Sequence, residues 1–231
     1  MKKIFFLSTI VCCALFLNAQ RVQRVTIGGN GTLLNFGLLL PQNVVIHVDQ
    51  TGALGEWGVD KYADRQMNNN IQKPLEKFEG RTENYKATDD SAFQGKLKMV
   101  GSAIITYYAS TDKPYLRGKV KAIGPIKFDY YSNYEDPMSQ GKLKMIGSNN
   151  VTYFGNYEND AIKGKVKAIG GTNFTYFGGL EDKAFAGKIK SLGSATFTYY
   201  NSSERNYGPG NIKTGSYFQS QGGLLYFIKN Y

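Results

Sequence analysis

The sequence predicts an all-β protein: a tandem array of β-hairpin repeats, arranged as a twisted antiparallel meander or a β-solenoid, after a cleaved signal peptide. Two observations predict this fold. A motif recurs every 23 residues in the later part of the 231-residue chain. The composition is rich in Tyr (17), Phe (14) and Gly (27) and poor in Pro (6). Aromatic and β-branched residues favour strands, and glycine favours tight turns.

The repeat has two halves, each a short run that favours β-structure. The first half has the form Gly-Lys-apolar-Lys-x-apolar-Gly. It begins at Gly95, Gly118, Gly141, Gly164 and Gly187, with a degenerate sixth copy at Gly210. The second half is of the type Phe-Thr-Tyr-Tyr and covers 105–108, 128–131, 151–154, 174–177 and 197–200. Because turn residues separate the halves, each repeat is predicted to form one β-hairpin.

The first 19 residues have the features of a secretory signal peptide. Lys2 and Lys3 precede an apolar run over 4–17, and the small residue Ala19 is suited to cleavage before Gln20. The run is shorter than the about 20 residues that span a bilayer, so no transmembrane segment is expected after cleavage. We therefore expect an exported protein, located in the periplasm, at the cell surface or secreted.

Cleavage would also change the cysteine content and the charge. Cys12 and Cys13 both lie in the signal peptide, so the mature chain is expected to have no disulfide, no thiol nucleophile and no cysteine ligand for a metal. Removal of Lys2 and Lys3 reduces the 28 basic residues to 26 against 18 acidic ones, a net charge of +8. A positive charge favours anionic partners, and it also serves solubility alone.

Three segments are expected: the signal peptide over 1–19, an irregular N-terminal part over 20–79 and the repeats over 80–231. Residues 31–37 and 52–58 resemble the repeat frame, and 44–48 has the composition of a buried strand. We interpret 20–60 as degenerate β-units that cap the array, because terminal repeats are atypical. The polar stretch over 60–79 is expected to be a loop or short helix at the boundary.

The period generates columns of equivalent residues. The first lysine column is Lys96, Lys119, Lys142, Lys165 and Lys188, and the second lysine column is Lys98, Lys121, Lys144, Lys167 and Lys190. The tyrosine column is Tyr107, Tyr130, Tyr153, Tyr176 and Tyr199. In either register considered below, a lysine column stands against an aromatic column, where cation–π contacts of about 0.5–1 kcal/mol each can form.

The register of the hairpin decides which side chains share a face. A four-residue turn over 101–104 would place Val100 opposite Ile105 and Lys98 opposite Tyr107. A one-residue bulge would place Lys98 opposite Tyr108 and exchange the two faces, because side chains alternate along a strand. The sequence leaves both registers open.

Two functional hypotheses follow from these columns. In the first, the protein binds an extended envelope polymer, a polysaccharide or another polyanion, through the second lysine column and the tyrosine column. In the second, it is a structural or adhesin-type scaffold of the cell envelope, with a protein partner at the ends of the array. Exposed tyrosines favour binding, whereas buried tyrosines beneath exposed lysines favour the scaffold. No feature points to a specific nucleic acid.

Catalytic groups are scarce, so we expect no enzyme and no cofactor. The only histidine, His47, could act as a general base with Asp49, but the chain has no nucleophile elbow. A hydrolase that depends on His47 is the third hypothesis. The repeated Gly-Lys lacks the frame of a phosphate-binding loop, and one histidine without cysteine cannot form a metal cluster. The acidic residues between hairpins vary too much between copies for a calcium-binding roll, and we expect solvated turn residues.

The repeat unit, Gly-Lys-[Leu/Ile/Val]-Lys-x-[Ile/Leu/Val]-Gly followed by Phe-Thr-Tyr-Tyr, resembles the tandem repeats of uncharacterised exported bacterial proteins over roughly 80–231. This resemblance implies a β-rich exterior protein with no known activity. The period is also similar to that of MORN repeats, which are β-hairpins. The chain lacks their Tyr-x-Gly-x-[Trp/Phe] start and Gly-x-Gly core, so lipid binding is not carried over. The stretch over 56–58 distantly resembles WG-type repeats, once.

Overall fold

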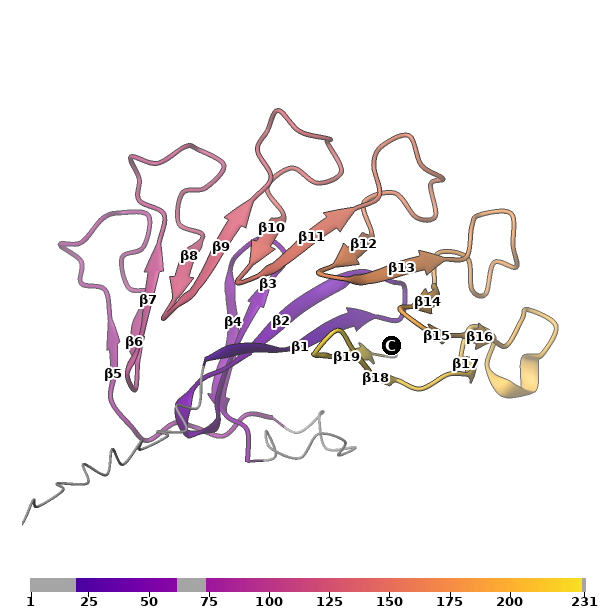
Figure 1. The fold of residues 1–231 in the computed structure, drawn as a ribbon, viewed down its shortest axis with the longest axis horizontal. Coiled ribbons are helices and arrows are strands. Elements are labelled where there is room, and N and C mark those ends of the chain that lie inside the picture. The colour runs from indigo at the N-terminus through magenta and orange to yellow at the C-terminus, as the bar shows by residue number, and fades with distance from the viewer. Residues whose placement is uncertain (1–19, 62–73, 230–231) are drawn as a thin grey trace, which may run out of the picture.

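The computed structural model describes residues 20–61 and 74–229, which form strands and turns in two large sheets (Figure 1). One sheet has eleven strands, one has six, and a further pair forms a two-stranded sheet. The predicted all-β fold and hairpin meander are confirmed. The predicted signal peptide and residues 62–73 of the expected loop or short helix lie outside the described residues.

The eleven-stranded sheet is the repeat array, in which each strand pairs antiparallel with the next one along the chain. Its strands are β5 (Thr82–Asn84), β6 (Leu97–Val100), β7 (Ala103–Tyr107), β8 (Val120–Ile123), β9 (Ile126–Tyr130), β10 (Leu143–Ile146), β11 (Asn149–Tyr153), β12 (Val166–Ile169), β13 (Thr172–Tyr176), β14 (Ile189–Leu192) and β15 (Ala195–Thr196). The two-stranded sheet follows, with β16 (Thr198–Tyr199) and β17 (Ile212–Thr214). The repeats spread like a fan with their long loops on the outside (Figure 1).

The six-stranded sheet joins the two ends of the described chain. Its strands are β1 (Arg21–Gly28), β2 (Leu33–Leu39), β3 (Val44–Asp49), β4 (Leu54–Val59), β18 (Phe218–Gln221) and β19 (Leu224–Lys229), and two 3-10 turns, η1 (Pro41–Asn43) and η2 (Arg205–Tyr207), complete the elements. The order is β18-β19-β1-β2-β3-β4, with β1 parallel to β19.

This six-stranded sheet differs from the terminal cap that the sequence predicts. Residues 20–60 pack on the array, and the last two strands, β18 and β19, belong to the sheet of β1–β4 and not to the array. The physical reason is the apolar inner face of the repeats, since a cap at one end would cover a single repeat and leave the others exposed. One core cluster includes side chains from both sheets, among them Ile105, Ile146, Phe36 and Ile27. Across it, the rings of Phe174 and Tyr226 are 5.7 Å apart.

Two turns of the six-stranded sheet approach the tyrosine column so closely that they require glycine. Gly52, in the β3–β4 turn, has φ +85, and a Cβ added there would lie 2.2 Å from the Tyr130 hydroxyl. Its carbonyl accepts a hydrogen bond from Val120 N at 3.0 Å. Gly31, in the β1–β2 turn, lies against Tyr176 in the same way, since a Cβ added at Gly31 would lie 2.6 Å from the Tyr176 ring. These contacts fix the position of the six-stranded sheet on the array.

Both hairpin registers considered from the sequence are wrong. Val100 pairs with Ala103, so the turn contains only Gly101 and Ser102. The other four hairpins have the same register. Gly101 has φ 57, which suits the first central position of a type II′ turn. This turn matches the right-handed twist of the strands, which explains why the two-residue connection forms.

The bulge lies between hairpins and not within them. Thr106 pairs with Ala122 and Tyr107 with Val120, so Lys121 is the additional residue on its strand. The bulge leaves Lys121 exposed while Val120 is buried. The same irregularity lies within β10, β12 and β14, where Lys144, Lys167 and Lys190 are the additional residues. It therefore places the second lysine column on the outer side of the array.

We expect Gly52→Ala to destabilise the protein by about 2–4 kcal/mol, measured by urea unfolding. Left-handed backbone strain of about 1 kcal/mol adds to the clash with Tyr130, because overpacking costs about 1–3 kcal/mol. Gly95→Ala is the matched control, since Gly95 has φ +71 and nothing lies within 4 Å of the added Cβ. Equal losses in the two variants would contradict the docking of this turn on the tyrosine column.

Candidate functional site

The first lysine column is part of the internal structure of the array. Lys142 Nζ donates a hydrogen bond to Gly164 O at 2.8 Å, 22 residues along the chain, and lies 4.9 Å from the centre of the Tyr153 ring. The same two contacts occur at Lys96, Lys119, Lys165 and Lys188. Burial lowers the pKa of Lys142, and that of Lys165 to about 8. These inter-repeat lysine bonds link each repeat to the next.

The tyrosine column is buried beneath these lysines. The exposed fractions are 6% for Tyr107, 2% for Tyr130, 9% for Tyr153, 8% for Tyr176 and 7% for Tyr199. The Tyr130 hydroxyl donates to Val120 O at 2.7 Å, and three of the other four make the equivalent bond. Burial raises the pKa of all five hydroxyls. This burial favours a role of these tyrosines in the fold over the predicted binding of a polymer, which stays a prediction.

The second lysine column lies on a different set of rings. The Nζ–ring centre distances are 5.6 Å for Lys98 and Tyr85, 5.3 Å for Lys121 and Tyr108, 5.2 Å for Lys144 and Tyr131, 5.7 Å for Lys167 and Phe154, and 5.4 Å for Lys190 and Phe177. Lys213 continues the column over Tyr200 at 5.4 Å. The sequence prediction omitted Lys213, although it lies 23 residues after Lys190 in the degenerate copy at 210–213.

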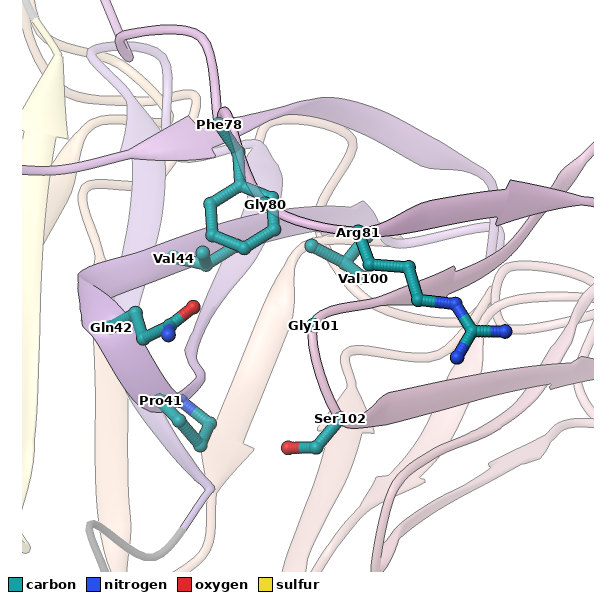
Figure 2. A pocket seen from close by; sticks show the side chains of 9 residues that line it. All are labelled: Pro41, Gln42, Val44, Phe78, Gly80, Arg81, Val100, Gly101 and Ser102. Atoms are coloured by element: carbon teal, nitrogen blue, oxygen red, sulfur yellow. The ribbon is translucent and has the colours of Figure 1, made fainter.

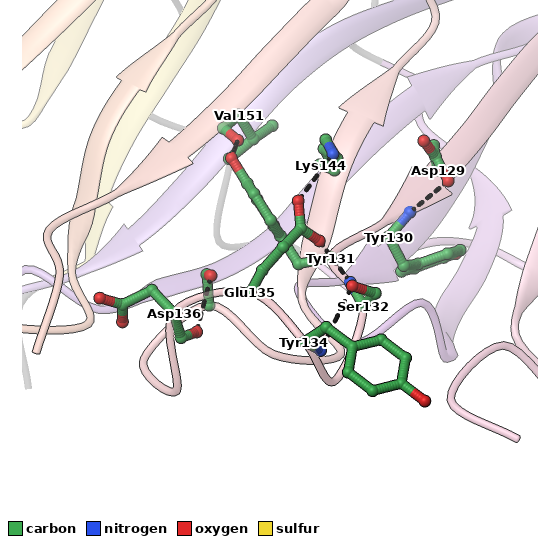
Figure 3. A network of polar contacts seen from close by, with 10 residues as sticks. Asp129, Tyr130, Tyr131, Ser132, Tyr134, Glu135, Asp136, Lys144 and Val151 are labelled. Carbon is green, nitrogen blue, oxygen red and sulfur yellow. Dashed lines mark hydrogen bonds and ion pairs between the residues drawn. The ribbon is translucent and has the colours of Figure 1, made fainter.

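Loop carboxylates neutralise part of the second lysine column. Glu135 Oε1 accepts a hydrogen bond from Lys144 Nζ at 2.8 Å, and Glu135 Oε2 accepts one from Ser132 N at 2.5 Å (Figure 3). The bond from Lys144 lowers the pKa of the Glu135 carboxyl. Lys213 pairs with Glu204 in the same way at 2.6 Å. Within the described part of the chain, the remaining four members, Lys98, Lys121, Lys167 and Lys190, have no carboxylate partner within ion-pair distance.

Other acidic side chains hold the loops in place. Asp136 Oδ1 accepts a bond from Met138 N at 2.8 Å, and its Oδ2 accepts one from Asn156 N in the next loop at 3.0 Å. Asp182 bonds Ala184 N and, in the following loop, Ser202 N. Besides facing solvent as expected, these carboxylates therefore accept hydrogen bonds from backbone N–H groups of their own loop and of the next one.

Three loop tips carry fully exposed apolar side chains that the sequence analysis missed. Tyr134 is 97% exposed, Tyr157 100% and Leu180 101%. They occupy the same position in successive repeats, and Figure 3 shows the Tyr134 ring directed away from the polar network of its loop. The 23-residue spacing would have revealed them.

His47 lies on β3, between β2 and the edge strand β4, and pairs with Gly37 of β2. Its Nε2 is buried with no hydrogen-bond partner among the described residues. Burial and, less strongly, the charge of Arg24 lower its pKa. The oxygen Asp49 Oδ1 accepts three bonds from Thr51 and Ala53 in the adjacent turn. The carboxylate that a catalytic triad would use is therefore engaged in holding this turn.

One pocket, of about 330 Å³, lies between η1 and the first hairpin turn (Figure 2). Pro41, Gln42, Phe78 and Ser102 are among its lining residues. Its one charged lining residue, Arg81, forms an ion pair with Glu83, and Figure 2 shows its guanidinium pointing away from Gln42. This pocket offers few polar groups to a ligand.

No helix in residues 20–61 and 74–229 is long and apolar enough to cross a membrane. The same residues contain no group of three His, Cys, Asp or Glu side chains that could hold a metal ion. Comparisons with protein-family models, curated proteins and solved structures found no match to this chain. The candidate site therefore depends on geometry alone, and the second lysine column is its main feature.

We expect the two lysine columns to differ in their effect on stability. Lys142→Met keeps the apolar stem but leaves Gly164 O without its donor, which should cost about 1–3 kcal/mol of unfolding free energy. Lys167→Met changes an exposed side chain and should cost less than about 0.5 kcal/mol. Urea unfolding of both variants measures the difference. If Lys142→Met is as mild as Lys167→Met, the inter-repeat lysine bonds do not hold the array.

We expect acid to destabilise the protein partly through His47. Its folded-state pKa is below the ordinary histidine value of about 6.5, so the unfolded chain binds the proton more readily. The stabilisation from neutral His47 is complete above about pH 6.5 and is lost as the pH falls through the lower folded-state pKa. His47→Gln should therefore flatten the decline of unfolding free energy as the pH falls below about 6.5. Parallel declines in the two proteins would show that His47 is not the group responsible.

Proposed function

We propose that the protein is a non-catalytic exported binding protein that holds an extended anionic polymer of the cell envelope along the second lysine column. The observation that carries this proposal is the placement of an ammonium group on an aromatic ring at the same position of successive repeats, from Lys98 to Lys213. Four of these ammonium groups have no carboxylate partner among the described residues.

The spacing of the column suits a repetitive ligand. Equivalent strands are two strands apart, roughly 9–10 Å, which is close to the Debye length in physiological salt. Each lysine is therefore screened from its neighbours and can take its own negative group. The ring beneath each stem restricts it before binding, which reduces the entropy lost on contact. Single contacts are weak, and a polymer gains affinity by occupying several at once.

A second candidate, a structural or adhesin-type scaffold, is favoured by the burial of the tyrosine column. All five of these tyrosines and the first lysine column serve the fold. In this case the second lysine column keeps a tyrosine-rich sheet soluble and protects it from edge association. The scaffold predicts no affinity for anionic polymers, which separates the two candidates.

The test is the combined replacement of Lys98, Lys121, Lys144, Lys167 and Lys190 by Gln. We expect binding to polyphosphate or polyglucuronate, measured by titration at low salt, to weaken at least tenfold without loss of the fold. Gln removes the charge and retains a polar side chain. Binding by the unmodified protein should weaken steeply with added salt, because exposed charges are screened.

The matched control replaces Lys86, Lys113, Lys127, Lys163 and Lys183 by Gln, which removes the same number of charges outside the column. It also contains one ion-paired lysine, Lys163, bound to Asp160. An equal loss in both variants would show that net charge and not the column binds the polymer. If the unmodified protein binds no anionic polymer at low salt, the scaffold is the function.

A further inference from the structure

A second concave site lies between the first repeats and the segment formed by β4 and the β3–β4 turn. The pocket has a volume of about 470 Å³. Leu54 and Trp57 line it from the six-stranded sheet, and Lys96, Leu97, Arg117 and Lys119 line it from the array. It contains no member of the second lysine column.

The pocket lies where the β3–β4 turn passes the first repeat. In the next two repeats the β3–β4 turn closes on the strands, with Val120 N donating to Gly52 O at 3.0 Å and Leu143 N to Gln50 O at 2.7 Å. The residue at the same position of the first repeat is Leu97, which lines the pocket instead. Leu97 is thus partly exposed to the pocket, whereas Val120 and Leu143 are buried.

Three cationic side chains line the pocket, and each has N–H groups beyond those used in the bonds described here. Lys96 Nζ gives one hydrogen bond to Gly118 O at 2.5 Å, which leaves two of its three protons. Lys119 makes the equivalent single bond. Arg117 Nε donates to Asp112 O at 2.9 Å, so the two terminal amino groups of the guanidinium remain. Burial lowers the pKa of Lys96 and Lys119, so both ammonium groups have lost water that an anion could replace.

The other wall is apolar and aromatic. Trp57 is half-buried, and Leu54 lies near it in the same lining. An indole face packs well against the C–H groups of a sugar ring, and an arginine fork with two ammonium groups suits a carboxylate or a phosphate. A ligand that satisfies both walls combines a ring with an acidic group.

We propose that this pocket binds a single acidic sugar, with the ring on Trp57 and the carboxylate or phosphate at Lys96, Arg117 and Lys119. The inference is independent of polymer binding by the second lysine column, because the two sites share no residue. Either can fail without the other.

Trp57 is the only tryptophan of the chain, so its fluorescence reports on this pocket alone. The experiment titrates the protein with glucuronate, with glucose 6-phosphate and with glucose at constant ionic strength. We expect a saturable change of emission with at least one acidic sugar, at a concentration at least tenfold lower than with glucose. The stronger of the two acidic sugars identifies the preferred anionic group. An equal response to glucose, or the same change with sodium sulfate, would overturn the proposal.

Variants locate the anionic group. Arg117→Gln leaves the inter-repeat lysine bonds intact and should weaken the acidic sugar about tenfold or more, since a hydrogen bond to a charged group contributes about 1.5–3 kcal/mol. Arg205→Gln is the control, an exposed arginine in a distant loop. The combined variant of the second lysine column should titrate as the unmodified protein does. Equal effects of Arg117→Gln and Arg205→Gln would contradict the assignment.

Discussion

The bond from a lysine ammonium to a glycine carbonyl of the next repeat is the interaction on which the array depends. At Lys142 the acceptor is Gly164 O, and the Tyr153 ring lies under the same ammonium. The lysine therefore joins two neighbouring loops over a buried aromatic side chain. Because the contact recurs with the period of the repeat, it adds up along the array in the way that nearest-neighbour interfaces stabilise other repeat proteins. Most of the buried side of the repeat is therefore occupied by the protein's own contacts.

The first lysine column serves the fold, and we propose two other places for partners. The outer side of the array offers the second lysine column, in which the bulge at positions such as Lys121 exposes the charge. The inner side is covered by the six-stranded sheet, and beside Leu97 of the first repeat Trp57, Lys96 and Arg117 line a pocket. An extended ligand suits the first place and a small one suits the second. Both places carry basic side chains, in keeping with the basic character of the chain.

The sequence predicts the hairpins and the lysine–aromatic contacts because a strict period makes neighbouring copies structurally equivalent. It does not distinguish the roles of Lys96 and Lys98. Both are lysines two residues apart, and simple alternation along a strand would place them on the same face. The bulge separates them: in the pairing of β5 with β6, Glu83 pairs with Met99 and Asn84 with Leu97, so Lys98 is the additional residue. The six-stranded sheet was missed for a different reason. The contacts that place it, such as Gly52 on Tyr130, join segments far apart in the chain, and no local pattern encodes them. The pocket was missed with it, since Trp57 and Arg117 meet only when the two sheets pack.

Lysine acylation of the native protein, followed peptide by peptide with mass spectrometry, tests most directly whether one lysine column holds the fold and the other is available to a partner. The account predicts that Lys98, Lys121, Lys167 and Lys190 react as fast as in the unfolded chain. It predicts that Lys96, Lys119, Lys142, Lys165 and Lys188 react at least tenfold more slowly until the protein is unfolded. Equal rates in the two columns would contradict it.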